Sequence, residues 1–191
     1  MNQLWIVRHA PTEWSRLGRH TSSTDVPLTD AGRVAAAGLA PALAGHPFAL
    51  VLTSPRTRAR DTATAAGFAG AAVDDDLHEW DYGDLEGLTT PEIQARGAGF
   101  EHWSIWRGPV PGGETIAEVA ARAGRVLGRV AAAAGDVLCF GHAHASRVLA
   151  AVALGFDPEA GARLALDPAT ISVVGEEHGE PALRLWNLRP A

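Results

Sequence analysis

Lysine is absent from this chain of 191 residues, and all 16 of its cationic side chains are arginines. The absence excludes Schiff-base chemistry on a lysine and the lysine of a Walker-type phosphate loop. A site for an anion must therefore be built from arginine, histidine or backbone amides. The formal net charge is -6 and the arginines form no run, which argues against nucleic acid as the main partner.

Cysteine and long apolar runs are also scarce. Cys139 is the single cysteine, so no internal disulfide can form, and its apolar neighbours in 137–140 are typical of a buried thiol. No apolar stretch reaches the length of a membrane span, and the run before Arg8 is too short and too soon interrupted for a signal peptide. We therefore expect a cytoplasmic protein with no membrane partner.

Hydrophobic residues make up 47% of the chain, which is enough for a real core, and no repeat or linker divides it. The expected organisation is one domain over residues 1–191. Short apolar runs predict strands at 4–7, 49–53, around Val73, and at 137–140, 171–174 and 183–186. Helices are expected at 30–43, 56–66, from Thr90, and at 115–134 and 143–154. This alternation predicts an α/β fold, a three-layer α/β/α sandwich with a mostly parallel central sheet.

Two of these helices have local start signals. Ser54 followed by Pro55 predicts an N-cap with proline in the first helical position. Thr115 and Glu118 fit a capping box at the start of the long helix. The first of these helices would begin close to whatever lies beyond the strand at 49–53.

Arginine and histidine follow three of the predicted strands. Arg8 and His9 come after the first, Arg58 after the second, and His142 after the strand at 137–140. Ligands of open α/β sheets bind beyond the carboxyl ends of the strands. An isolated Arg-His pair is usually a surface feature, but two arginines and two histidines at one edge would suit a phosphate dianion.

Five segments in a fixed order extend this pattern over most of the chain. They are Arg8-His9-Ala10-Pro11-Thr12-Glu13-Trp14; Asp25-Val26-Pro27-Leu28-Thr29 with Gly32; Ser54-Pro55-Arg56-Thr57-Arg58-Ala59 with Thr62-Ala63; Glu79-Trp80-Asp81-Tyr82-Gly83-Asp84-Leu85-Glu86-Gly87; and Pro111-Gly112-Gly113-Glu114-Thr115 followed by Gly141-His142. Together they resemble the motifs of the histidine phosphatase superfamily, which includes the phosphoglycerate mutases and many phosphatases. The resemblance implies the phosphoglycerate mutase-like fold.

The same resemblance implies a role for each core residue. His9 would attack phosphorus and form a phosphohistidine, Glu79 would protonate the leaving oxygen, and water would then cleave the intermediate. Arg8, Arg58 and a cationic His142 would stabilise the charge on the phosphoryl oxygens. Neither a metal ion nor a cofactor is expected.

Three acidic residues follow Glu79 in the same loop: Asp81, Asp84 and Glu86. Nearby negative charge raises the pKa of a carboxyl group, so we expect Glu79 to hold its proton. This argument predicts a pH optimum on the acid side of neutral.

The sequence departs from the superfamily's pattern at four positions. Ala10 and Ala143 stand where glycine is usual after each histidine, which predicts some strain or reshaping of the pocket. Pro11 removes an amide donor. Ser15 stands where the mutases carry an asparagine that contacts phosphate, and we keep it as a candidate phosphate ligand.

The leaving-group pocket is the least defined part of the prediction. Candidate substrate contacts are Thr21, Ser22, His144 and Trp103, and a packing role remains open for the last two. The other histidines show no metal-ligand spacing and are interpreted as surface or structural: His20, His46, His78, His102 and His178.

The predicted function is a metal-independent phosphomonoester hydrolase, and the chain most resembles small bacterial acid phosphatases of broad specificity. One alternative is a cofactor-dependent mutase, although residues 80–113 supply only Arg96 and Arg107 where mutases carry extra basic residues. Another is a phospho-ligand binding module without turnover. The expected partner is a small-molecule phosphomonoester, and a homodimer is one alternative for the oligomeric state.

Overall fold

The computed structural model describes residues 2–190, which form a six-stranded sheet in the order β3-β2-β4-β1-β5-β6. The strands are β1 (Leu4–Arg8), β2 (Leu50–Thr53), β3 (Ala72–Val73), β4 (Val137–Gly141), β5 (Ile171–Glu177) and β6 (Glu180–Leu188). The first four strands pair in parallel, whereas β5 is antiparallel to β1 and β6 to β5. The expected mostly parallel sheet is therefore confirmed.

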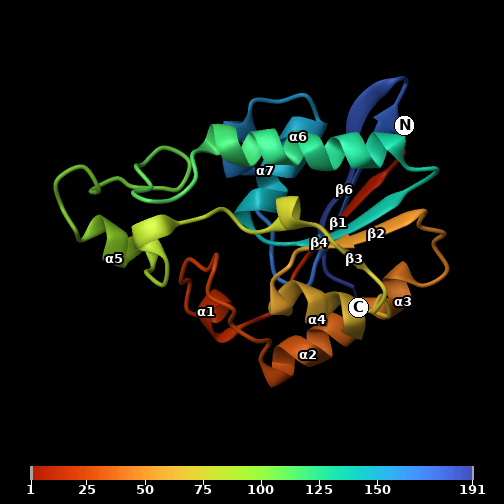
Figure 1. Ribbon diagram of the computed structural model, residues 1–191, viewed down its shortest axis with the longest axis horizontal. Coiled ribbons are helices and arrows are strands. Elements are labelled where there is room, and N and C mark those ends of the chain that lie inside the picture. Colours follow the sequence, from red (N-terminus) through yellow and green to blue (C-terminus); the bar gives the residue numbers. More distant parts are fainter. Residues whose placement is uncertain (1, 191) are drawn as a thin grey trace.

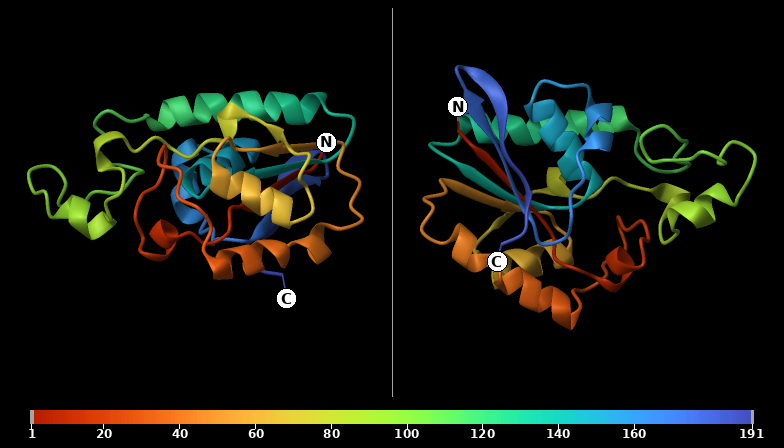
Figure 2. Two further views of the ribbon diagram at one scale, coloured as in Figure 1. Left: turned by 60° about the horizontal axis from the view of Figure 1, so that its bottom comes forward. Right: turned by 180° about the vertical axis from the view of Figure 1, so that it is seen from behind.

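Helices cover both faces of this sheet. They are α1 (Glu13–Arg16), α2 (Asp30–Ala37), α3 (Ala40–Leu43), α4 (Thr57–Ala65), α5 (Thr90–Gln94), α6 (Ile116–Ala132) and α7 (His144–Ala153). Short 3-10 turns lie at Asp75–Leu77, Gly83–Leu85 and Pro158–Arg163. Figure 1 shows α6 and α7 on one face and α2, α3 and α4 on the other, while α5 lies on an arm beyond the sheet, and Figure 2 shows the same layers from two further sides. The predicted three-layer sandwich is confirmed.

The alternation of side chains along β4 explains the two layers. Val137 and Cys139 belong to the cluster packed against α6 and α7, whereas Leu138 and Phe140 belong to the cluster packed against α2, α3 and α4. Successive side chains of a strand point to opposite faces, so an uninterrupted apolar run places this strand between two cores. The carboxyl ends of the central strands are thereby held rigidly from both sides.

The helix expected over 30–43 is broken into α2 and α3. Pro41 lies in the first turn of α3 and has no amide hydrogen to donate to the carbonyl of Ala37. The chain therefore turns at Gly38, whose amide closes the end of α2, and restarts as a new helix. The prediction of one continuous helix was wrong for this reason.

The start of α4 also differs from its prediction. The helix begins at Thr57 rather than at 55–56, and Ser54 is not its N-cap. Asp25 accepts hydrogen bonds from the backbone amide and the hydroxyl of Thr57, and so supplies the cap from another segment. Ser54 Oγ instead accepts the amide of Arg56 over 3.3 Å and lies 2.7 Å from His142 Nε2. The capping box of Thr115 and Glu118 is confirmed.

The final hairpin is longer than expected. Glu177 pairs with Glu180, so only His178 and Gly179 turn between β5 and β6. Both have positive φ values, 53° and 88°, as two-residue hairpin turns of the favoured type require. None of the helices in residues 2–190 is both long and apolar enough to cross a membrane.

Candidate active site

The carboxyl ends of β1, β2 and β4 bring the four predicted strand-end residues together. Arg8 ends β1 and His9 follows it, Arg58 lies in the first turn of α4, and His142 follows β4. The rings of His9 and His142 lie 5.2 Å apart between centroids. Arg58 Nε donates a hydrogen bond to His142 Nδ1 over 3.3 Å.

His9 has the orientation that a nucleophilic imidazole needs. It is 5% exposed, and its Nδ1 lies 2.8 Å from the carbonyl oxygen of Ala10. Burial, with Arg8 and Arg58 nearby, holds the pKa of His9 well below its usual range. The ring is therefore neutral, its Nδ1 hydrogen is donated to Ala10, and the lone pair on Nε2 is left free.

His142 does not carry the charge that the sequence analysis expected. It is fully buried, and burial followed by Arg58 and His9 holds its pKa well below the usual range. Because Nδ1 accepts the hydrogen bond from Arg58, the proton lies on Nε2, which donates it to Ser54 Oγ over 2.7 Å. In this arrangement His142 is a neutral imidazole, and the expected cation was wrong.

The two arginines of the site differ in how much of their donor capacity is used. Fully buried Arg58 also donates to the carbonyls of Thr21, Ser22 and Thr24, at 3.1–3.2 Å, and so fastens that loop over the site. Arg8 donates through Nη1 to the Leu166 carbonyl, but its buried Nε makes no hydrogen bond within residues 2–190. That Nε is a donor available to an anion.

Glu79 lies at the N-terminus of α7. Its carboxylate accepts hydrogen bonds from the backbone amides of Ala143, His144 and Ala145, at 2.8–3.1 Å, and from the amide of Trp80. Burial raises the pKa of Glu79. The His144 side chain and the amides of Ala145, Trp80 and His144 together lower it by more, so the net shift is downward. Amides at a helix N-terminus stabilise a carboxylate.

The expectation that acidic neighbours raise the pKa of Glu79 is therefore wrong. Asp81 accepts hydrogen bonds from Ser22 and from the amide of Gly83. Glu86 binds the backbone amides of Ser22 and Thr24. These carboxylates mainly hold the segment of Ser22 and Thr24 against the loop, and none of them is among the main causes of the shift at Glu79.

A cavity of about 180 Å³ opens in front of His9 and is lined in part by Arg8 and Glu79. His20, Tyr82 and Arg147 also line it, although the sequence analysis interpreted His20 as surface or structural and assigned no role to the other two. Arg147 lies one turn beyond His144 on α7, and that three-residue spacing was the available signal. No comparable signal pointed to His20.

The predicted substrate contacts fall into two sets. His144 lines the cavity, and its Nδ1 lies 2.6 Å from the hydroxyl of Tyr82. Thr21 lines it too, with its hydroxyl donating to the Arg19 carbonyl. Ser22 and Trp103 are not among the lining residues: both are buried, and the indole of Trp103 donates to the Pro109 carbonyl as a packing residue.

Ser15 lines the cavity, but its hydroxyl takes part in a capping box. It accepts from the amide of Thr12 and donates to the Thr12 carbonyl at the start of α1. The hydroxyl hydrogen is thus already used, and Ser15 as a phosphate ligand stays a prediction that requires this bond to open.

The alanines that replace glycine cause no backbone strain. Ala143 has φ −72° and ψ −70°, and Ala10 is not among the non-glycine residues with positive φ in 2–190. Ala10 packs in the core cluster with Val7 and Leu28. The expected strain was therefore wrong, since neither position uses the freedom that only glycine has.

Within residues 2–190, no group of three or more histidine, cysteine, aspartate or glutamate side chains is arranged to hold a metal ion. The donors around His9 are instead arginine and backbone N–H groups, which suit an anion.

Comparison with known proteins agrees with this geometry. The acid phosphatase of Mycobacterium tuberculosis is 38% identical over 192 residues, covering 98% of this chain and 93% of that protein. The sedoheptulose 1,7-bisphosphatase of Saccharomyces cerevisiae is 35% identical, covering 78% of this chain and 66% of that protein. A solved structure of an open reading frame from Mycobacterium tuberculosis superimposes with a TM-score of 0.91 and 37% identity, covering 100% of this chain and 99% of that one. A family model also matches residues 4–189, and the chain belongs to the histidine phosphatase superfamily (branch 1).

Proposed function

We propose that this phosphatase hydrolyses phosphomonoesters without a metal ion, through a phosphohistidine on His9. Membership of the superfamily supports phosphatase chemistry with small phosphate esters as substrates. The observation that carries the proposal is the orientation of His9. Its Nδ1 is bound to the Ala10 carbonyl, so the lone pair on Nε2 remains for phosphorus.

In the first step, Nε2 of His9 forms a bond to phosphorus while the bond from phosphorus to the ester oxygen breaks. The leaving oxygen takes a proton from the Glu79 carboxyl group, which lines the same cavity. Arg8 supplies its free Nε to the phosphoryl oxygens, and buried Arg58 adds positive charge behind them.

In the second step, water attacks the phosphohistidine and the bond between phosphorus and Nε2 breaks. The Glu79 carboxylate, left by the first step, takes the proton from that water. Inorganic phosphate leaves, and both residues return to their starting states. One residue thus serves as acid and then as base.

The proton on Glu79 requires an explanation, because the pKa of this carboxyl is lowered. A phosphomonoester dianion beside it would raise that pKa by charge repulsion. The lowered pKa of Glu79 favours loss of its acid form toward the acid side, and the lowered pKa of His9 favours its neutral form in the same direction. An acid-side pH optimum follows from these two shifts rather than from acidic neighbours.

Broad specificity is the finer part of the proposal. The cavity walls combine cations, such as Arg19 and Arg147, with the rings of His20 and Tyr82. Such a mixed lining suits esters of varied leaving groups. A panel of phosphomonoesters would test it, and activity on one ester alone would contradict it.

One domain over 1–191 and a cytoplasmic location also remain proposals.

The mechanism is tested by assaying p-nitrophenyl phosphate hydrolysis with excess EDTA. The native chain should turn over, and His9→Ala should lose the activity because no other group can accept the phosphoryl unit at that position. His46→Ala is the matched control, since His46 binds Asp136 away from the cavity, and it should keep the activity.

Equal activity of the native chain and His9→Ala would overturn the mechanism. No turnover in either would favour the binding module, and phosphoglycerate interconversion that depends on added bisphosphoglycerate would favour the mutase. Acid-quenched enzyme should also carry labelled phosphate only when His9 is present.

A further inference from the structure

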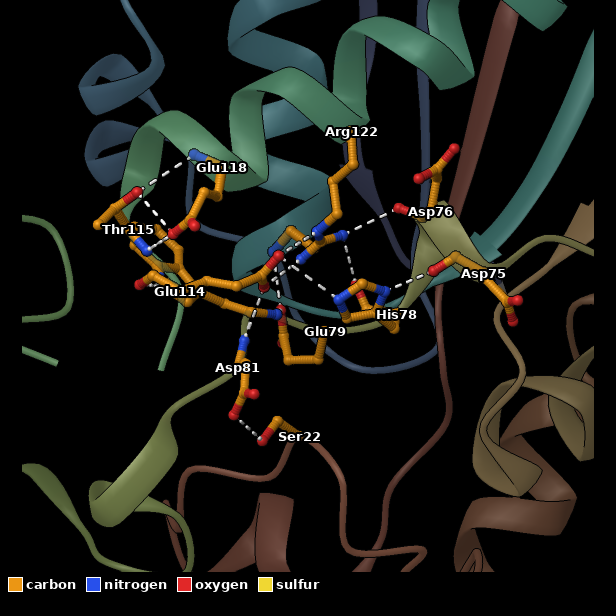
Figure 3. A network of polar contacts seen from close by, with 12 residues as sticks. Ser22, Asp75, Asp76, His78, Glu79, Asp81, Glu114, Thr115, Glu118 and Arg122 are labelled. Atoms are coloured by element: carbon orange, nitrogen blue, oxygen red, sulfur yellow. Dashed lines mark hydrogen bonds and ion pairs between the residues drawn. The ribbon is translucent and has the colours of Figure 1, made fainter. Parts of the chain in front are cut away.

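An ion pair of buried Arg122 in α6 and partly buried Glu114 just before it holds the chain on both sides of Glu79 (Figure 3). Arg122 is 3% exposed. Neither member of the pair lines the cavity in front of His9. Their connection to the site therefore runs through the backbone of the loop that carries Glu79.

Arg122 holds the residues that precede Glu79. Its Nη1 donates to the carbonyl of Asp76 over 2.9 Å and to the carbonyl of His78 over 2.7 Å. Its Nε and Nη2 donate to the two carboxylate oxygens of Glu114 at 2.9 and 3.0 Å. The guanidinium fork is thus used in two directions at once, which a lysine ammonium cannot reproduce.

Glu114 holds the residues that follow. Its Oε2 accepts the amide of Asp81 over 2.9 Å, and its backbone carbonyl accepts the indole N–H of Trp80 over 2.8 Å. His78 lies 3.5 Å from its Oε1. The peptide groups before and after Glu79 are therefore tied to one ion pair.

We infer that Arg122 and Glu114 are positioning residues of the phosphoryl transfer, which fix residues 76–81 so that Glu79 can deliver its proton to the leaving oxygen. The inference rests on the proposed function, in which Glu79 is the proton donor. Proton transfer requires hydrogen-bond reach, and a misplacement of about 1 Å can cost about 10²-fold in rate.

A role in stability alone is the weaker explanation of this pair. Taking the Arg122 guanidinium out of water is costly, and well-packed apolar residues often stabilise a fold as well as or better than an ion pair. The bonds of this pair are also directed at the loop that carries Glu79. The two explanations differ in a measurable way, because a proton donor matters most when the leaving group is poor.

The experiment compares two substrates on one enzyme preparation. p-Nitrophenyl phosphate has a good leaving group that needs little protonation, whereas glycerol 2-phosphate has a poor one. The quantity measured is the ratio of kcat/KM for glycerol 2-phosphate to kcat/KM for p-nitrophenyl phosphate. This ratio does not depend on the fraction of the sample that is folded, so partial misfolding cannot imitate the effect.

Arg122→Met should lower this ratio by about tenfold or more relative to the native chain. Arg122→Lys, which keeps the charge but not the fork of donors, should also have a lowered ratio. Glu114→Gln is the second variant, should Arg122→Met fail to fold, and it should lower the ratio in the same direction. Arg125→Met is the matched control: Arg125 lies on the same helix, and its guanidinium donates to the Asp76 side chain rather than to the backbone of the loop. It should leave the ratio unchanged.

Glu79→Gln separates the inference from the proposed function. It should lower the ratio by about 10²-fold or more if Glu79 is the proton donor. An unchanged ratio in Glu79→Gln would overturn that role and the inference with it. A fall in Glu79→Gln with no change in Arg122→Met and Glu114→Gln would overturn the positioning role alone.

Discussion

The residues that line the cavity or lie behind it form two groups that are built in different ways. The strand-end group is Arg8, His9, Arg58 and His142, and the loop group is Arg19, His20, Thr21 and Tyr82. Members of the first group are tied to one another: Arg58 donates to His142, and the His142 ring lies 5.2 Å from that of His9. The loop group is held mainly by ring contacts, such as that of His20 with Tyr82, and by backbone hydrogen bonds between segments far apart in the sequence.

Exposure separates the two groups only at their extremes. Arg58 and His142 are fully buried and the side chain of Arg19 is 34% exposed, but Tyr82 of the loop group is also buried, at 2%. Groups held by packed strands keep a fixed geometry, while loops tolerate change. We infer that the strand-end group supplies the chemistry common to all substrates and that the loop group selects the leaving group.

Arg58→Met is the strongest test of this division. Loss of a buried cation that stabilises the transferring phosphoryl group should lower kcat/KM by about 10²–10³-fold. The loss should be similar for every phosphomonoester, since the phosphoryl group is common to all of them. Steady-state assays on a panel of esters measure it. The control is Arg60→Met, since Arg60 is exposed and lies two residues after Arg58 on α4. A loss confined to a few esters would contradict the division.

The strand-end group could be predicted from the sequence for a physical reason. Each member follows an apolar run directly, and the ends of parallel strands share one edge of the sheet. The protonation states could not be predicted in the same way. Three of the four amides that bind the Glu79 carboxylate come from the N-terminal end of α7, 64–66 residues away in the sequence.

The loop group depends on contacts that no local pattern encodes. The amide of His20 donates to the carbonyl of Leu88, and the amide of Gly87 donates to the carbonyl of His20. Arg19 and Thr89 form an isolated bridge beside these bonds. Two segments about seventy positions apart thus place His20 at the cavity, and sequence reasoning that reads each segment alone interprets it as a surface residue.

His20→Ala should have a smaller effect of a different kind. It should change the relative kcat/KM values of different esters by about tenfold, because one side chain of a leaving-group pocket distinguishes substrates by that order. The same panel of esters measures it, with exposed His102→Ala as the control. An equal loss for all esters would place His20 with the strand-end group and break the comparison.

The smallest effect expected concerns stability, where the two groups should behave alike. Burial lowers the pKa of His144, which contacts the loop group through Tyr82, to about 3 from its usual 6.5. Between these values the unfolded chain binds a proton that the folded chain does not, so the free energy of unfolding falls as the pH is lowered. The free energy of unfolding, measured with urea from about pH 6 to about pH 4, should depend less steeply on pH in His144→Asn. The slope should fall by at most the contribution of about one proton.

His142→Asn should reduce this slope as well, because the pKa of His142 is also held well below its usual range, first by burial and then by Arg58. The two variants should then differ in catalysis, since His142→Asn removes a strand-end residue and should lower kcat/KM for every ester. A steeper slope in His144→Asn would contradict the neutral state assigned to His144. Equal activity in the two variants would contradict the assignment of phosphoryl chemistry to the strand ends.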